Sequence, residues 1–176
     1  MNMKKFLLFT LLATVISTRA FADFGLGVIG GVDVNTGAAW RIGATLGMGS
    51  QTGSPFIIDV LFNGSDNSFS IKPTFDWHAL TWNIAIVQIY LGLGVGTEFA
   101  FGTSDHDLDP FGFTLAARIP VGVKIFISAF EWFFEVTPQL GWHNYSRDVS
   151  YGSNHRVDSN SFYWAIGLYT GFRFWF

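Results

Sequence analysis

The chain has 176 residues, of which 18% are aromatic and only 13% are charged, and it contains 20 glycines and no cysteine. Soluble domains carry about 25% charged residues, so this composition argues against an ordinary soluble globular domain. Without cysteine, no disulfide can hold the fold together. The few basic residues leave no positively charged face, which argues against nucleic-acid binding.

The first 22 residues have the layout of a cleavable signal peptide. Lys4 and Lys5 precede an apolar run over 6–16, and the small-residue site Ala20-Phe21-Ala22 follows. This run is shorter than the roughly 20 apolar residues of a membrane-spanning helix, and a retained anchor is the alternative. We expect cleavage after Ala22, export from the cytoplasm and one mature domain over 23–176. That domain has thirteen acidic and seven basic residues, a formal charge of −6.

Alternation of apolar with small or polar residues, the period of a β-strand, runs through most of the mature chain. The uncharged segment 79–97 is long enough to span a membrane as a helix, but its alternating glycines favour a strand. Pro120 predicts a bulge or other irregularity inside the sixth strand. Turns are expected at 35–37, 49–55, 81–83 and 128–130, and polar loops at 63–68, 102–110 and 146–160. The eight expected strands lie near 24–34, 40–48, 56–62, 69–78, 84–101, 111–127, 131–143 and 162–176.

The two faces of each expected strand differ in size and polarity. One face is large and apolar, and the other consists mainly of Gly, Ala and Thr with single charges. A soluble barrel would turn the apolar face inward and leave a poorly solubilising surface. In a membrane barrel, small residues fit the narrow lumen of eight strands and the apolar face meets lipid. We therefore predict an all-β fold, a closed antiparallel eight-stranded transmembrane β-barrel.

The aromatic residues also support an apolar face that points outward to lipid. They fall near the ends of the expected strands, as in the two girdles of a transmembrane barrel. With both termini in the periplasm, the longest polar loops lie outside. The expected periplasmic girdle is Trp77, Trp82, Phe130, Trp132, Phe174 and Phe176, and the expected outer girdle is Trp40, Phe62, Phe69, Phe101, Phe111, Trp142, Phe162 and Trp164.

Eleven charged residues, six acidic and five basic, fall on the predicted inner face. Their near balance predicts a salt-bridged network that fills and closes the lumen, because an unpaired charge in a narrow barrel is costly. A continuous polar path for solutes or ions is the alternative. The predicted lumen-lining network is Asp33, Arg41, Asp59, Lys72, Asp76, Glu98, Arg118, Lys124, Glu131, Glu135 and Arg173.

The final segment, Gly171-Phe172-Arg173-Phe174-Trp175-Phe176, resembles the carboxy-terminal sorting motif of outer-membrane β-barrels. The chain is similar in length and strand count to small OmpX, OmpA-domain and OmpW-like barrels, and segments 117–123 and 130–138 resemble a group of eight-stranded barrels from diderm bacteria. The resemblance implies location in the outer membrane, contact with its lipid and lipopolysaccharide, and insertion by the barrel assembly machinery. In that family the machinery reads the alternating terminal residues, here Phe172, Phe174 and Phe176.

Three groups of residues suggest chemistry, but each is incomplete. His143 and Ser146 resemble the His and Ser of barrel lipid-A hydrolases, yet a spacing of three puts them on opposite faces of a strand. Asp76 and His78 share a face without an evident nucleophile, and a structural hydrogen bond is expected there. The carboxylates of 105–109 alternate as in the start of a calcium loop but lack its later Gly and Glu. We expect no enzymatic activity, no cofactor and no metal.

Taken together, these features predict a monomeric outer-membrane protein with a structural or surface-binding role. Its outer loops would contact an extracellular ligand, since binding residues are concentrated in loops on a rigid scaffold. Its lumen would be closed. The alternative is an OmpW-like narrow channel for small apolar molecules.

Overall fold

The computed structural model describes residues 23–35, 38–65, 68–102, 111–150 and 154–176. The expected signal peptide, the tip of the turn at 35–37 and nearly all of the acidic loop at 102–110 lie outside these residues. The described residues form nine strand segments: β1 (Phe24–Val34), β2 (Ala38–Met48), β3 (Phe56–Ser65), β4 (Ser68–Ile84), β5 (Val87–Gly102), β6 (Phe111–Arg118), β7 (Val121–Ile127), β8 (Phe130–Ser150) and β9 (Asn154–Trp175).

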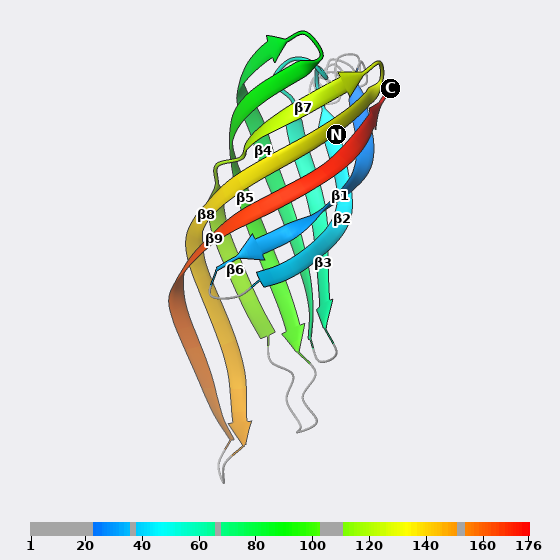
Figure 1. The fold of residues 1–176 in the computed structure, drawn as a ribbon. Coiled ribbons are helices and arrows are strands. Elements are labelled where there is room, and N and C mark those ends of the chain that lie inside the picture. Colours follow the sequence, from blue (N-terminus) through cyan, green and yellow to red (C-terminus); the bar gives the residue numbers. More distant parts are fainter. Residues whose placement is uncertain (1–22, 36–37, 66–67, 103–110, 151–153) are drawn as a thin grey trace, which may run out of the picture.

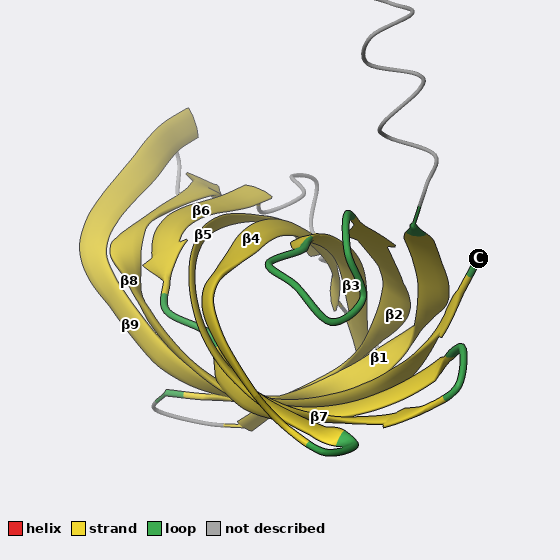
Figure 2. Ribbon diagram, turned by 90° about the horizontal axis from the view of Figure 1, so that it is seen from above, coloured by secondary structure: helices red, strands yellow, loops and turns green. Residues whose placement is uncertain are grey.

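The strands close into a ring in which neighbours are antiparallel (Figures 1 and 2). β1 to β5 pair in chain order, β8 pairs with β9, and β9 pairs back with β1 over Gly25–Val34 and Ile166–Trp175. β6 and β7 act as one barrel strand, because both pair with β5 on one side and β8 on the other. The ring therefore has eight strands, and the predicted fold class is confirmed.

The break between β6 and β7 falls at Ile119 and Pro120, where irregularity is predicted. Pro120 has no N–H to donate to a neighbouring strand, but its carbonyl accepts the Gly92 N–H at 2.7 Å. The register with β5 is the same on both sides of the break, as the pairs Gly94–Arg118 and Leu91–Val121 show. The proline therefore interrupts the strand without changing its pairing register with β5.

The side-chain faces point as predicted, with most large apolar residues outside and mainly small or polar residues inside, together with a small buried apolar group that includes Leu61 and Phe133. In β4, Phe75 and Trp77 are 42% and 43% exposed, whereas Asp76 between them is 1% exposed. Stacked rings occur near both ends of the barrel, including Phe24 with Phe176 at the end that holds the carboxy-terminus. The apolar surface of this protein is therefore its outside, which suits contact with lipid rather than water.

The end of β4 and the start of β5 both lie later in the chain than the sequence predicts. β4 continues through the expected turn at 81–83, and the chain turns at Ala85 and Ile86 instead, where Ala85 has φ of 54°. β4 also carries a bulge, because its register with β5 shifts by one residue between Trp77 and Leu80. The bulge moves the outward set from odd to even positions, so Leu80 and Trp82 point outward like Trp77.

The expected polar loop at 146–160 is wrong in its bounds, because most of it is strand. β8 and β9 stay paired as far as Ser150 and Asn154. Their hairpin reaches beyond the other strands at the end opposite the carboxy-terminus (Figure 1). The backbone ladder continues there without the apolar alternation that marks the lipid-facing part of each strand, so the hydrophobic pattern gave no sign of it.

The helical alternative for 79–97 is also wrong. These residues lie in β4, a two-residue turn and β5. In the part of the chain that the structure describes, no helix is both long enough and apolar enough to span a membrane.

Candidate functional site: the charged lumen and its outer vestibule

The predicted lumen charges all face the inside of the barrel. Each of the nine strand segments contributes at least one of them, and ten of the eleven are at most 8% exposed. The eleventh, Glu98, lies closer to the mouth opposite the carboxy-terminus, which is named the outer mouth after the predicted orientation, and its side chain is 15% exposed. Ten of the eleven residues form three layers along the barrel, and Lys124 lies outside these layers.

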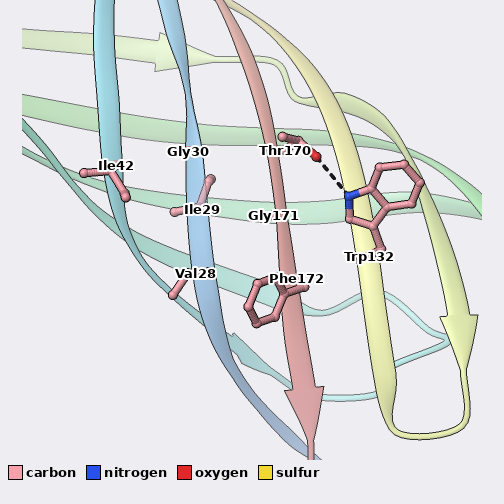
Figure 3. A pocket seen from close by; sticks show the side chains of 8 residues that line it. All are labelled: Val28, Ile29, Gly30, Ile42, Trp132, Thr170, Gly171 and Phe172. Atoms are coloured by element: carbon pink, nitrogen blue, oxygen red, sulfur yellow. Dashed lines mark hydrogen bonds between the residues drawn. The ribbon is translucent and has the colours of Figure 1, made fainter.

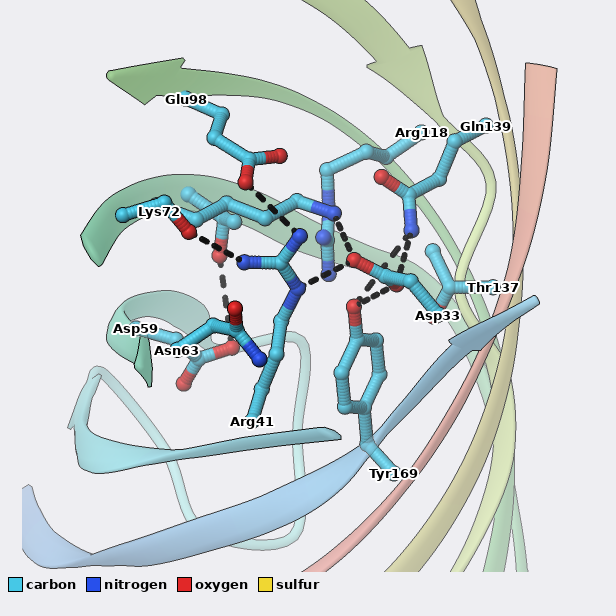
Figure 4. Close-up of polar contacts among 12 residues, drawn as sticks. Asp33, Arg41, Asp59, Asn63, Lys72, Glu98, Arg118, Thr137, Gln139 and Tyr169 are labelled. Atoms are coloured by element: carbon cyan, nitrogen blue, oxygen red, sulfur yellow. Dashed lines mark hydrogen bonds and ion pairs between the residues drawn. The ribbon is translucent and has the colours of Figure 1, made fainter. Parts of the chain in front are cut away.

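The outer layer centres on the carboxylate of Asp33 (Figure 4). Its Oδ2 lies 2.5 Å from Nε of Arg41 and 2.6 Å from Nζ of Lys72. Its Oδ1 accepts hydrogen bonds from Nε2 of Gln139, at 3.0 Å, and from the Tyr169 hydroxyl. Residues from five strands thus meet at one carboxylate, and four donors compensate its removal from water.

Arg41 extends this layer toward the outer mouth. Its Nη2 lies 2.9 Å from Oε1 of Glu98, and its Nη1 donates to the Ser70 hydroxyl at 3.2 Å. A guanidinium presents several donors in a rigid plane, so one side chain can bridge two carboxylates. Arg41 therefore links the buried network to the partly exposed Glu98.

The middle layer is a two-pronged ion pair between Arg118 and Asp76. Nε and Nη2 of Arg118 lie 3.0 and 2.9 Å from the two carboxylate oxygens of Asp76. Nη2 also lies 3.7 Å from Oε1 of Glu135. Glu135 accepts hydrogen bonds from the hydroxyls of Tyr90, at 2.8 Å, and Thr137, at 2.5 Å. This layer crosses the barrel from β4 to β6 and β8.

The alternating glycines of β5 make room for the middle layer. A Cβ atom on Gly94 would overlap Oδ1 of Asp76, and one on Gly96 would lie 3.0 Å from Cδ of Arg118. A larger residue at Gly94 would therefore displace the Asp76 carboxylate. The glycine pattern in the sequence reflects this close approach of charged side chains in a narrow lumen.

The third layer, near the carboxy-terminal end of β9, centres on Arg173 and Glu131. Nη1 of Arg173 lies 2.5 Å from Oε1 of Glu131, its Nε donates to the Thr45 hydroxyl at 2.8 Å, and the guanidinium carbon lies 4.2 Å from the Phe133 ring centroid. Asp59 lies 4.0 Å away. The large cation is thus enclosed by one carboxylate, one hydroxyl and one ring face, and a second carboxylate lies farther off.

Trp175 closes the lumen beside this layer. Its Nε1 donates to Oε2 of Glu131 at 2.9 Å. The indole lies flat against two strands, since Cβ atoms on Gly25 and Gly47 would come within 2.8 and 2.6 Å of it. Trp175 is 5% exposed, so its indole lies inside the barrel and is not part of an aromatic girdle.

The turn over 49–55 bends across the same end of the barrel (Figure 2). Nε2 of Gln51 donates to the Ser128 carbonyl at 3.2 Å, and the Thr52 carbonyl accepts from Nδ2 of Asn83 and Nε2 of Gln88, at 3.0 and 2.8 Å. These contacts tie the β2–β3 turn to the β4–β5 and β7–β8 ends. The turn therefore covers the mouth of the lumen.

The opposite mouth is an open polar vestibule formed by two adjoining pockets of about 290 and 260 Å³. Both are lined by Asn35, Glu98 and Tyr163. In the second pocket, the Thr114 hydroxyl lies 2.7 Å from Nδ1 of His143. A carboxylate, an imidazole, an amide and a phenol converge on this space, which can take a small polar molecule.

A third pocket, of about 290 Å³, lies on the outer face of the wall (Figure 3). Outward-facing Gly30 and Thr170 are cross-strand partners there, between the larger Ile42 and Trp132. The Trp132 indole donates to the Thr170 hydroxyl at 3.1 Å, and that hydroxyl donates to the Phe133 carbonyl at 2.9 Å. The groove is an apolar indentation in which the polar groups of Trp132 and Thr170 are already bonded to protein.

Among the described residues, the structure does not bring those considered for chemistry together as a catalytic set. The hydrogen bond expected between Asp76 and His78 is wrong, because Arg118 engages the Asp76 carboxylate and neither ring nitrogen of His78 has a hydrogen-bond partner among the described residues. The side chain of Ser146 lies outside those residues. Within the described part of the chain, no group of three or more His, Cys, Asp and Glu side chains could hold a metal ion.

Sequence reasoning missed the roles of Tyr169 and Trp175. Both occupy inward positions of the period-two pattern in β9, so a bulky aromatic on the small-residue face was the available signal. The turn over 49–55 gave no such signal, since only the fold brings Gln51 near Ser128. The terminal residues Phe172, Phe174 and Phe176 all point outward and are 46%, 49% and 65% exposed.

Comparison with known proteins identifies the fold. No protein-family model matches the sequence, and no curated protein matches it. Among solved structures, a major outer membrane protein from Thermus thermophilus is similar over 88% of this chain and 100% of its own, with TM-score 0.54 and 11% identity. The N-terminal β-barrel domain of Pseudomonas aeruginosa OprF is similar over 85% and 97%, with TM-score 0.52 and 13% identity. The chain thus has the fold of the small bacterial outer-membrane β-barrels.

Removing Arg118 tests whether the buried charges stabilise one another. Arg118→Met leaves Asp76 and Glu135 without their nearest cation, and we expect a loss of about 3–5 kcal/mol in the free energy of unfolding. Adding Asp76→Leu should recover most of this loss. The matched control is Glu98→Gln, whose amide oxygen can still accept from Arg41 while Arg41 keeps its ion pair with Asp33, so the expected cost is well below that of Arg118→Met. Urea unfolding in detergent micelles measures all three, and an Arg118→Met protein as stable as the parent would contradict the paired network.

Proposed function

We propose that this protein is an integral outer-membrane barrel that acts without catalysis or conduction, as a closed scaffold whose outer surface binds ligand. The observation that carries the proposal is the contrast between the two ends of the lumen. One end is covered by Trp175 and the turn over 49–55, whereas the other opens into the polar vestibule around Glu98 and Tyr163.

The filled cross-section supports a closed lumen. The three layers of ion pairs occupy successive levels of the barrel, and the bulky side chains of Arg118, Tyr90 and Arg173 are at most 1% exposed. Conduction needs a continuous water column, and an eight-stranded barrel has an interior just wide enough for side chains to fill. The same arrangement gives the outer surface a rigid support.

The outer end carries the features suited to binding. The vestibule offers hydrogen-bond donors and acceptors beside the Tyr163 ring, which favours a small polar ligand. The β8–β9 hairpin stands beyond the barrel at this end (Figure 1) and extends the surface available to a larger partner. The described strand ends that flank the predicted loops, Ser65 of β3, Gly102 of β5, Phe111 of β6 and the paired ends of β8 and β9, lie at the same end and belong to the proposed binding surface.

The proposal includes the surroundings of the barrel. Outer-membrane lipid and lipopolysaccharide would cover the apolar wall, and the barrel assembly machinery would read Phe172, Phe174 and Phe176 during insertion. The orientation places both chain ends of the barrel domain in the periplasm. The protein would act as a monomer, because its strand edges are already paired within one chain.

Electrical recording tests the closed lumen. In planar lipid bilayers we expect no conductance steps from the purified, folded barrel, because buried ion pairs block each level of its lumen. A porin added to the same bilayer provides the positive control, and the slower gel mobility of heated samples verifies folding. Reproducible steps from the folded protein would contradict the proposal and favour a narrow channel.

Single-cysteine labelling in intact cells tests the orientation, and the cysteine-free chain gives a clean background. We expect Ser161→Cys, beside the vestibule, to react with a membrane-impermeant maleimide. Thr52→Cys, in the turn over 49–55, serves as the matched control and should react only after the outer membrane is permeabilised. The opposite pattern would place the vestibule in the periplasm and overturn the surface-binding role.

A further inference from the structure

Beneath the turn over 49–55, the structure assigns a second polar site to the lumen, distinct from the vestibule. We propose that His78, Gln88 and Lys124 form a binding site for buried water molecules, which the turn closes from the periplasm. This inference concerns the periplasmic half of the lumen and does not depend on which ligand the outer surface takes.

The site is marked by buried polar atoms that the protein itself leaves unbonded. His78, Gln88 and Lys124 are each 0% exposed. Both ring nitrogens of His78, Oε1 of Gln88 and Nζ of Lys124 have no hydrogen-bond partner among the described residues. Leaving such atoms unbonded is costly, and most of all for a buried ammonium group. Ordered water is the usual partner of buried polar groups that protein atoms do not satisfy.

These atoms belong to one place in the barrel. Gln88 of β5 and Lys124 of β7 are direct cross-strand partners, and both face inward. The His78 ring stacks on the Tyr90 ring with centroids 4.0 Å apart, and Nζ of Lys124 lies 5.0 Å from the Tyr90 centroid. Tyr90 thus contacts both His78 of β4 and Lys124 of β7, and Gln88 of β5 is the direct neighbour of Lys124.

The neighbouring carboxylates are bonded to other groups and do not serve as partners for Lys124. Glu131 is bonded to Arg173 and Trp175, and Glu135 is bonded to Tyr90 and Thr137. No carboxylate oxygen of the described residues forms an ion pair with Nζ of Lys124 within 4.0 Å, and the interaction with the Tyr90 ring satisfies none of its three N–H donors. The ammonium group therefore needs a small acceptor that can reach it inside the barrel.

The mixture of donors and acceptors selects water over an anion. Lys124 only donates, Oε1 of Gln88 only accepts, and a neutral imidazole does one of each. Water can satisfy all of them because it both donates and accepts. An anion would leave Gln88 Oε1 unbonded and would also face the carboxylates of Glu131 and Glu135.

Gln88 connects this site to the turn that covers it. Its Nε2 donates to the Thr52 carbonyl at 2.8 Å and to Oδ1 of Asn83 at 2.7 Å, while its Oε1 is the unbonded acceptor of the site. The turn is otherwise tied down by exposed side chains, through Asn83 to Thr52 and Gln51 to Ser128. On the vestibule side, the Arg118–Asp76 pair blocks the lumen. Water would therefore exchange through the turn.

Hydroxyl-radical labelling of the full-length folded protein tests the site, because radicals made from bound water by an X-ray pulse oxidise the side chains in contact with it. We expect oxidation of His78 and Tyr90 several-fold faster than oxidation of Phe133. Phe133 is the matched control because it is 1% exposed and packed beneath the Arg173 guanidinium. Labelling of His78 and Tyr90 no faster than that of Phe133 would overturn the water site.

The closing role of the turn is tested by isotope exchange in the same assay. After a pulse of ¹⁸O-water, the double variant Gln51→Ala with Asn83→Ala should incorporate ¹⁸O at His78 and Tyr90 several-fold faster than the parent protein. Both substitutions lie at exposed positions, or nearly so, at the barrel end, so the fold should be retained. Incorporation at Tyr163 in the vestibule should not change. Equal rates at His78 in parent and variant would overturn the closing role of the turn.

Discussion

The hydrogen-bonded seam between β1 and β9 determines the rest of this structure. Residues Gly25–Val34 pair with Ile166–Trp175, so the first and last strands of the barrel leave no free edge. In hydrocarbon a backbone N–H or C=O has no water to bond, and closure is the way in which a sheet satisfies all of them. Closure with eight strands fixes a narrow interior. Most inward positions are therefore glycines, small residues or polar side chains, with a few buried apolar side chains such as Leu61 and Phe133 among them, and most large apolar side chains point outward.

The way in which the inward polar side chains are paired differs along the length of the barrel. At the outer mouth, Arg41 bridges the buried Asp33 to the partly exposed Glu98, so the network ends at a polar surface open to ligand. In the middle, the Arg118–Asp76 pair forms a tightly bonded barrier. Toward the end covered by the turn over 49–55, the described residues supply too few partners for Lys124 and His78, and we assign the remainder to water beneath this turn. A lumen that opens to a polar surface at one end and is blocked in the middle by ion pairs suits the proposed scaffold for surface binding better than a conduit.

The sequence predicts which residues face the lumen but not which of them meet. Period two identifies the inward set, and the alternating glycines of β5 indicate a crowded interior. The contacts themselves join strands far apart in the chain, as Gln139 and Tyr169 do with Asp33. No local pattern specifies such pairs, because the stagger of the strands sets their heights. The bulge in β4 could have been read from the change of the apolar set from odd positions through Trp77 to even positions from Leu80. The extensions of β8 and β9 past the other strands lack apolar alternation and so resembled a loop.

Nitroxide scanning of β8 tests the central claim, that the apolar stripe meets lipid and the polar stripe lines a packed lumen. Single cysteines at successive positions from Trp132 to Leu140, spin-labelled in lipid vesicles, report access to oxygen and to a water-soluble nickel complex. We expect oxygen access to rise and fall with a period of two, high at Phe134 and Val136 and low at Glu135 and Thr137, with little nickel access at the inward sites. High nickel access at the inward sites would reveal a water-filled pore. High nickel access at Phe134 and Val136 would mean that the apolar stripe does not face lipid, and either result would contradict the account.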